Sequence, residues 1–387
     1  MYTLLLAVIY IAFISLGLPD SLLGAGWPAM NIDLGVPISY AGIITMIISG
    51  GTIVSSLMSD KTTAKFGTGA VTFISVLLTA AAMFGFSVSK SLALLCLWAI
   101  PYGLGAGAID AALNTYVALN YSSKHMSWLH CFWGVGTIIS PYIMSYALTA
   151  NLTWHGGYRI VAVIQFVITA FMLLCLPLWK STASDDDTER KPRSLSDIFK
   201  INGVLKMLIG FFAYCAAEAT VMLWASSYMV RVHGINEQQA AAYASLFFIG
   251  ITFGRFVSGF ISNRLGDAKL IRTGAIITIL GAIFVSMPLK YCTIAGFITA
   301  GLGCAPIYPS IIHSTPFNFG KENSQAVIGV QMASAYVGST FMPPIFGLIA
   351  NHISIRLLPV YILIFMALLL IMTESLNKTV QKRNGEV

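Results

Sequence analysis

Charged residues are scarce in this sequence of 387 residues. Only 10% are Asp, Glu, Lys or Arg, whereas 57% are hydrophobic and the mean hydropathy is +0.80. A soluble domain carries about 25% charged residues, so the composition excludes an ordinary soluble protein. A charged side chain is costly where it faces hydrocarbon, and this explains the scarcity. We therefore expect the lipid bilayer to cover most of the surface. We expect no nucleic-acid partner, because the basic residues behind the net charge of +7 lie in short connections.

The sequence also lacks the patterns that indicate metal, redox or hydrolytic chemistry. Its six cysteines all lie in apolar stretches, and none forms a CxxC pair or a Cys/His cluster at metal-binding spacing. There is no phosphate-binding glycine loop and no nucleophile–base pair near a membrane face. We therefore expect no cofactor, no metal and no enzymatic activity, with an integral-membrane enzyme or a receptor as remote alternatives.

What the sequence does contain is a series of long apolar stretches, each close to the roughly 20 residues that a spanning helix needs. The twelve predicted spans are 3–26, 38–58, 68–88, 91–118, 126–149, 157–178, 203–230, 238–263, 270–289, 291–314, 324–350 and 354–375. They predict an all-α integral membrane protein with twelve transmembrane helices. The only long polar connection divides the chain nearly in half. The predicted parts are a six-helix bundle at 1–179, a cytoplasmic linker at 180–200, a second six-helix bundle at 201–375 and a cytoplasmic tail at 376–387.

The basic residues alternate between the two sides of these spans. Sixteen of the 22 Lys and Arg residues fall on one side, five fall on the other, and Arg255 lies within a span. Short cytoplasmic loops carry the excess of Lys and Arg, so we expect both termini and the central linker in the cytoplasm. The predicted location is the cell membrane, plasma or inner, which the chain crosses many times.

The two halves of the chain repeat each other. Short matches occur in the same order and at nearly one offset: 103–110 with 301–308, 136–141 with 338–343, and 59–61 with 262–264. Three matches in order indicate a duplicated six-helix unit, a parallel repeat of the kind that builds some secondary transporters. We expect two pseudo-symmetric bundles.

Four charged residues lie well inside the predicted spans, where such groups usually line a polar cavity or pair with one another. These are Asp20, Asp110, Glu218 and Arg255. Asp110 shares a helix face with Asn114 and two glycines, and our hypothesis is that it takes up and releases a coupling proton. Asp20 and Glu218 are the other proton-coupling candidates. The alternatives are a structural acid for Asp110, a solvent-wetted acid for Asp20 and an ion-paired acid for Glu218.

A small polar solute can form hydrogen bonds with carboxylates and amides and can pack an apolar face on an aromatic ring. Residues with this chemistry occur at several positions in the spans. The predicted substrate-binding residues are Asp20, Asn114, His130, Trp133, Tyr214, Glu218, Tyr308 and Gln331. For each polar or aromatic residue taken singly, helix packing or a place in an interfacial aromatic belt is the alternative.

The connection after the second span, and its copy after the eighth, resemble the cytoplasmic signature of the major facilitator superfamily. The first copy contains Gly51, Asp60, Lys61, Lys65 and Gly67; the second contains Arg255, Gly259, Asn263, Arg264, Gly266 and Asp267. The resemblance covers essentially the whole chain. It implies a cytoplasmic latch for the outward-open state, formed here by Asp60, Lys61, Arg255 and Arg264.

Within that superfamily the sequence resembles the fucose/galactose/glucose:proton symporter branch, which carries an acid in helix 1 and another in helix 4. Asp20 and Asp110 fit these places. The helix 4 acid of that branch is usually Glu, and its helix 5 Gln–Asn pair falls here at His130 and Trp133. The resemblance implies alternating access and proton-coupled symport of a small polar solute such as a monosaccharide, by a monomer. The alternatives are an exporter of drugs, lipids or metabolites, or a sodium-coupled transporter.

Overall fold

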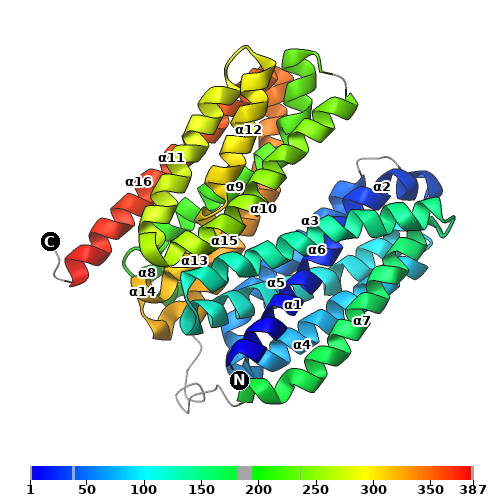
Figure 1. The fold of residues 1–387 in the computed structure, drawn as a ribbon. Coiled ribbons are helices and arrows are strands. Elements are labelled where there is room, and N and C mark those ends of the chain that lie inside the picture. Colours follow the sequence, from blue (N-terminus) through cyan, green and yellow to red (C-terminus); the bar gives the residue numbers. More distant parts are fainter. Residues whose placement is uncertain (1, 37–39, 181–193, 236, 385–387) are drawn as a thin grey trace. The chain divides into compact units, whose positions relative to one another are not determined.

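The computed structural model describes residues 2–36, 40–180, 194–235 and 237–384, and these are almost entirely helical (Figure 1). In lipid every backbone N–H and C=O must be paired within the protein, and a continuous helix does this along its whole length. By its contacts the chain divides into two compact units. Unit 1 comprises Met1–Tyr116 and Leu129–Arg193, and unit 2 comprises Val117–Trp128 and Ser194–Val387.

Unit 1 is built around α4 and α7, which pack along each other, and α1 lies against both. The helices of the first half are α1 (Tyr2–Asp20), α2 (Leu22–Asp33), α3 (Ala41–Leu57), α4 (Ser59–Val88), α5 (Leu92–Asn120), α6 (Ser123–Thr149) and α7 (Thr153–Lys180). Fully buried apolar residues such as Phe13 and Phe86 form its core. Residues 117–128, which are the end of α5, the connection after it and the start of α6, belong to unit 2 by their contacts.

Unit 2 is built around α9, which packs on α15, α16 and α10, while α12 packs on α10 and α11. Its long helices are α9 (Val204–His233), α10 (Glu237–Leu265), α11 (Asp267–Val285), α12 (Lys290–Cys304), α15 (Ser324–Ile349) and α16 (Leu358–Asn384). Its short elements are α8 (Leu195–Lys200), α13 (Ile307–His313), α14 (Thr315–Phe319), η3 (Lys321–Asn323), η4 (Ala350–Ser354) and η5 (Ile355–Leu357).

The predicted twelve spans are confirmed for the described residues. Ten stretches are long and apolar enough to cross a membrane; one of them, Lys321–Arg383, holds both α15 and α16, and the shorter apolar helix α3 completes the set. The spans are therefore α1 with the start of α2, α3 to α7, α9 to α11, α12 with α13, α15 and α16. The all-helical membrane fold is as predicted.

The repeated glycines occupy equivalent places in the two units. A side chain at Gly103 of α5 would meet the backbone of α3, and one at Gly301 of α12 would meet the backbone of α10. In the same way Gly136 of α6 faces the α1 backbone, and Gly338 of α15 faces the α9 backbone. Glycine allows the close helix–helix approach that membrane bundles use. In each unit the second span thus packs closely on the fourth, and the first span on the fifth. This is the expected pseudo-symmetry.

The turns after the second and eighth spans also share one backbone conformation. Gly67 has φ 77° and ψ 156°, and Gly266 has φ 75° and ψ 157°. Residues that have a side chain rarely adopt this positive-φ backbone conformation, whereas glycine adopts it freely. The repeat therefore extends to the two turns that carry the family signature.

Parts of the predicted linker and of the predicted tail are helical where the structure describes them. The predicted linker 180–200 falls mainly on 181–193, outside the described residues, but its end forms α8, which begins where the Ser194 side chain accepts a hydrogen bond from the Asp197 amide. The predicted tail from 376 continues α16 to Asn384. It stays helical because Leu376 and Val380 are buried, and because Lys206 of α9 donates to the Thr379 hydroxyl at 2.8 Å.

Candidate functional site

Asp20 follows Pro19 and is the last residue of α1, and a single non-helical residue, Ser21, separates α1 from α2. Its side chain is exposed. One carboxylate oxygen accepts a hydrogen bond from the Tyr102 hydroxyl of α5 at 2.7 Å, and the other accepts from the Trp133 indole N–H of α6 at 2.8 Å. Three helices of unit 1 therefore meet at this carboxylate. A carboxylate has about four lone-pair positions, so two protein donors leave acceptor capacity for a ligand.

Tyr102 was not among the predicted site residues. It follows Pro101 in an apolar stretch of α5 and is 4% exposed, so the sequence gives no sign that its hydroxyl reaches a polar group. The only indication in the sequence that Tyr102 lies near the site was its position two helical turns before Asp110 on the same helix. Its contact with Asp20 joins residues 82 positions apart in the chain.

Asp110, Asn114 and His130 form a second polar group in unit 1, and all three are at most 5% exposed. The Asn114 amide nitrogen donates to the Asp110 carboxylate at 2.7 Å and to the Asp110 backbone carbonyl at 2.9 Å. The Asn114 amide oxygen lies 3.1 Å from Nε2 of His130. The predicted shared face of Asp110 and Asn114 is confirmed.

The two groups of unit 1 are neighbours because His130 and Trp133 lie on one helix, three residues apart. Side chains at this spacing are about 5–6 Å apart at Cβ. The group around Asp20 and the group around Asp110 therefore lie close to each other along α6. α6 is thus the element that connects the two groups.

Glu218 and Arg255 form an ion pair inside unit 2. The Arg255 guanidinium lies 3.4 Å from a Glu218 carboxylate oxygen, and their side chains are 6% and 14% exposed. The same oxygen accepts from the Tyr214 hydroxyl at 2.8 Å, and that hydroxyl also reaches the Cys304 carbonyl at 3.0 Å. Of the two expectations for Glu218, the ion-paired acid is the one this geometry matches.

Tyr308 and Gln331 lie nearby in unit 2 but not in one cluster. The Tyr308 ring packs on Tyr214 with centroids 6.4 Å apart, and its hydroxyl lies 3.2 Å from the sulfur of Met332. Gln331 is fully buried on α15, where its oxygen accepts from the Thr315 hydroxyl at 2.9 Å. Its amide nitrogen has no hydrogen-bond partner among the described residues.

The four predicted latch residues are spread over different surroundings. Asp60 is half-buried in the first turn of α4, and Lys61 beside it is exposed. Arg264 is exposed in the last turn of α10, whereas Arg255 lies with Glu218 in the bundle interior. A latch role for these residues stays a prediction.

The acid of the second signature copy is Asp267, at the first position of α11. One of its oxygens accepts from the Ser123 hydroxyl at 2.6 Å, and the other lies 2.6 Å from Nδ1 of His313. Nε2 of His313 in turn lies 3.1 Å from the Tyr121 carbonyl. Ser123 and His313 were not predicted, because they come from segments 144 and 46 residues away from Asp267.

The comparison with known proteins identifies the family. The sequence model of the Major Facilitator Superfamily matches residues 9–290 and 207–385. The chain belongs to the major facilitator superfamily. It is therefore a multi-pass membrane transporter by family, as its resemblance implied.

Individual relatives of this transporter are distant. It is 25% identical over 291 residues to the glucose/mannose transporter GlcP of Bacillus subtilis, covering 70% of this chain and 69% of the relative. It is 23% identical over 336 residues to an uncharacterized MFS-type transporter of Yersinia pestis, covering 84% and 83%. The crystal structure of the E. coli fucose:proton symporter FucP matches with a TM-score of 0.78 and 17% identity over 97% of this chain and 99% of that one. That likeness shows the fold.

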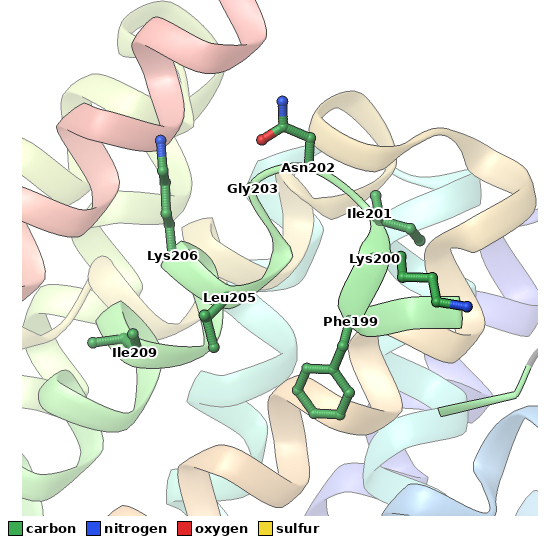
Figure 2. Close-up of a pocket in the computed structure, with 8 residues that line it drawn as sticks. All are labelled: Phe199, Lys200, Ile201, Asn202, Gly203, Leu205, Lys206 and Ile209. Atoms are coloured by element: carbon green, nitrogen blue, oxygen red, sulfur yellow. The ribbon is translucent and has the colours of Figure 1, made fainter. Parts of the chain in front are cut away.

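The transporter also has a pocket of about 400 Å³ away from these residues, beside the turn between α8 and α9 (Figure 2). Its lining residues are Phe199, Lys200, Ile201, Asn202, Gly203, Leu205, Lys206 and Ile209. The side chains of Lys200 and Lys206 extend in different directions in Figure 2. None of the predicted site residues lines this pocket.

Proposed function

We propose that this transporter carries a small polar solute, with a monosaccharide as the leading candidate, together with protons by alternating access. It acts as a monomer in the cell membrane with both termini in the cytoplasm. The observation that carries the proposal is the Asp20 carboxylate, which is exposed and positioned by Trp133 and Tyr102. Sugar hydroxyls donate to such a carboxylate, and an indole ring packs on the C–H face of a pyranose.

The proton-coupling part of the proposal is carried by Asp110. A buried carboxylate in a membrane bundle is costly when charged, and Asp110 is 4% exposed. Proton binding removes that charge, and α6 carries both His130, beside the Asp110 group, and Trp133, which donates to Asp20. The proposal thus uses an exposed acid, Asp20 on α1, for the solute and a buried acid, Asp110 on α5, for the proton.

The names of two relatives support a monosaccharide as the solute class. GlcP is a glucose/mannose transporter and FucP is a fucose:proton symporter. This transporter is 25% and 17% identical to them, and its own solute is identified by the uptake experiment below.

The experiment is uptake of radiolabelled fucose, galactose and glucose into proteoliposomes, with and without an acid-outside pH gradient. We expect accumulation that a protonophore abolishes. Accumulation that requires a sodium gradient instead would replace the proton by Na⁺. The absence of flux for all three sugars, in protein shown to be folded, would contradict the sugar proposal and favour an exporter or another solute.

Three substitutions separate the roles of the acids. Asp20→Asn should weaken solute binding about tenfold or more, because a hydrogen bond to a charged group contributes about 1.5–3 kcal/mol. Asp110→Asn should abolish gradient-driven accumulation and leave solute exchange. Asp33→Asn is the matched control, because Asp33 also accepts from an indole, that of Trp154 at 2.9 Å, outside this group. It should transport normally.

A further inference from the structure

We propose that the pocket beside the turn between α8 and α9 binds an anionic phospholipid. The lipid phosphate is held at Lys206, and the acyl chains lie along Leu205 and Ile209 of α9. None of the predicted solute-binding or proton-coupling residues lines this pocket. The inference therefore does not depend on the solute or on the coupling ion.

The pocket lies where a span begins. The apolar stretch that can cross a membrane starts at Val204. The lining residues 199–203 precede it, at the level of the lipid headgroups, whereas Leu205 and Ile209 lie in its first turns. The chain turns sharply between the two parts because Gly203 has φ 96°, a conformation that glycine adopts freely. A ligand of this pocket thus meets both the headgroup layer and the hydrocarbon, as a phospholipid does.

Lys206 is a half-buried cation with no carboxylate partner among the residues that the structure describes. Its ammonium donates to the Thr379 hydroxyl at 2.8 Å and to the Ser375 carbonyl at 3.3 Å, both on α16. These acceptors are neutral, so they position the ammonium without compensating its charge. An ammonium has three hydrogens, and the third is left for an anion in the pocket that Lys206 lines.

The neighbouring end of α16 is also basic. Lys382 and Arg383 follow Thr379 by three and four residues, a spacing that places them on the same side of the helix, and both are exposed. The acid on this part of α16, Glu374, is held by the Arg272 guanidinium at 2.6 Å and 2.7 Å. Basic groups at the end of a span attract anionic lipids, so the charge of this region fits such a ligand.

The polar and apolar side chains of the pocket point in opposite directions. In Figure 2 the side chains of Asn202 and Lys206 extend upward from the turn, whereas those of Phe199 and Leu205 extend downward. Phe199 and Leu205 are 51% and 56% exposed. Asn202 and Lys206 therefore offer hydrogen-bond donors to a phosphate, and the exposed apolar side chains offer a surface to its acyl chains.

Lys200, the other lysine of the pocket, has a different role. It is paired with Asp197 of the same short helix at 3.2 Å, and its side chain is 72% exposed. In Figure 2 it extends away from Lys206. The two lysines thus do not converge on one anion, and the phosphate position is assigned to Lys206.

The first test measures lipid binding directly. Transporter purified in detergent is titrated with dioleoyl phosphatidylglycerol and, separately, with dioleoyl phosphatidylcholine, and bound lipid is counted by native mass spectrometry. The two lipids have the same acyl chains, but only phosphatidylglycerol has a net negative charge. We expect the first phosphatidylglycerol to bind about fivefold more tightly or better. Equal affinity of the wild-type protein for the two lipids would overturn the proposal.

The second test locates the charge. Lys206→Met should weaken phosphatidylglycerol binding about fivefold, equivalent to about 1 kcal/mol, and leave phosphatidylcholine binding within about twofold. Lys206→Arg keeps the charge and should retain the preference. Lys269→Met is the matched control, because Lys269 is exposed near the start of α11 and does not line the pocket. An unchanged affinity in Lys206→Met, or an equal loss in Lys269→Met, would contradict a site at this pocket.

The third test distinguishes a lipid from free phosphate, and it remains decisive if Lys206→Met does not fold. Leu205 is 56% exposed, so Leu205→Gln changes the pocket without disturbing the packing of α9. It should weaken phosphatidylglycerol binding about threefold or more and leave the affinity for inorganic phosphate, measured by calorimetry, as in wild type. If inorganic phosphate binds as tightly as the lipid and Leu205→Gln has no effect on either, the pocket is a free-anion site and the lipid assignment is wrong.

Discussion

Breaking the buried ion pair of Glu218 and Arg255 should destabilise unit 2 strongly, and removing both charges together should restore much of the loss. The two side chains are 14% and 6% exposed and their charged atoms are 3.4 Å apart. At that distance the Coulomb attraction is about 5 kcal/mol with an effective dielectric constant of 20. The cost of desolvating both charges offsets much of this gain.

The single variants differ from the double variant because they leave one buried charge without its partner. Arg255→Met leaves the Glu218 carboxylate buried beside the Tyr214 hydroxyl of α9, which donates to it at 2.8 Å, and without the positive charge of the guanidinium. Glu218→Gln leaves the guanidinium in the bundle interior. Each should cost about 3–5 kcal/mol. The double variant Glu218→Gln/Arg255→Met buries no charge, and we expect a loss of no more than about 1–2 kcal/mol, the usual cost of one imperfect hydrogen bond.

The assay is thermal unfolding of the purified variants in one detergent, followed by tryptophan fluorescence. We expect both single variants to melt well below wild type and the double variant to melt above either single one. Lys200→Met is the control, because its ion pair with Asp197 is exposed, with side-chain exposures of 72% and 54%, and an exposed pair contributes about 0–1 kcal/mol. Additive losses in the double variant would refute the reasoning, because they would mean that the two charges do not depend on each other.

Three further predictions concern other parts of the molecule. Trp133→Phe keeps an aromatic ring but removes the indole donor to Asp20, so half-saturation for solute should rise about tenfold in uptake assays; an unchanged value would remove Trp133 from the site. Asp267→Asn weakens the contact with His313, so melting of unit 2 should fall by an amount equivalent to about 1.5–3 kcal/mol, and a melting temperature equal to wild type would contradict this. His233 lies beyond the span of α9, and burial lowers its pKa. The folded state therefore favours the neutral ring, and its stability should decrease as the pH falls below about 6.5, more in wild type than in His233→Gln.

The spans and the repeat follow from the sequence because they depend on local properties. Hydropathy over about 20 residues decides whether a helix can cross a bilayer, and each span carries that information within itself. The glycines behave in the same way. Gly103 and Gly301 were matched by position alone, and both proved to be points of close helix approach.

The acids of the site were also visible in the sequence, because a carboxylate inside an apolar span is costly and therefore conspicuous. Asp20, Asp110 and Glu218 all lie in polar groups of the structure. Their partners on the same helix, Asn114 and Tyr214, are one turn away and follow from helical periodicity.

The partners on other helices were decided by the tertiary structure. Tyr102 reaches Asp20 across 82 residues, and Arg255 reaches Glu218 across 37, because the rotation of each helix in its bundle determines which side chains meet. For that reason Arg255, predicted from its motif to act in a latch, lies in an interior ion pair. The sequence by itself determined which segments span the membrane and which residues carry buried charge. Only the packing of the helices decided which charges and donors face one another, because each such contact depends on the relative rotation of two helices, which the hydropathy of neither helix encodes.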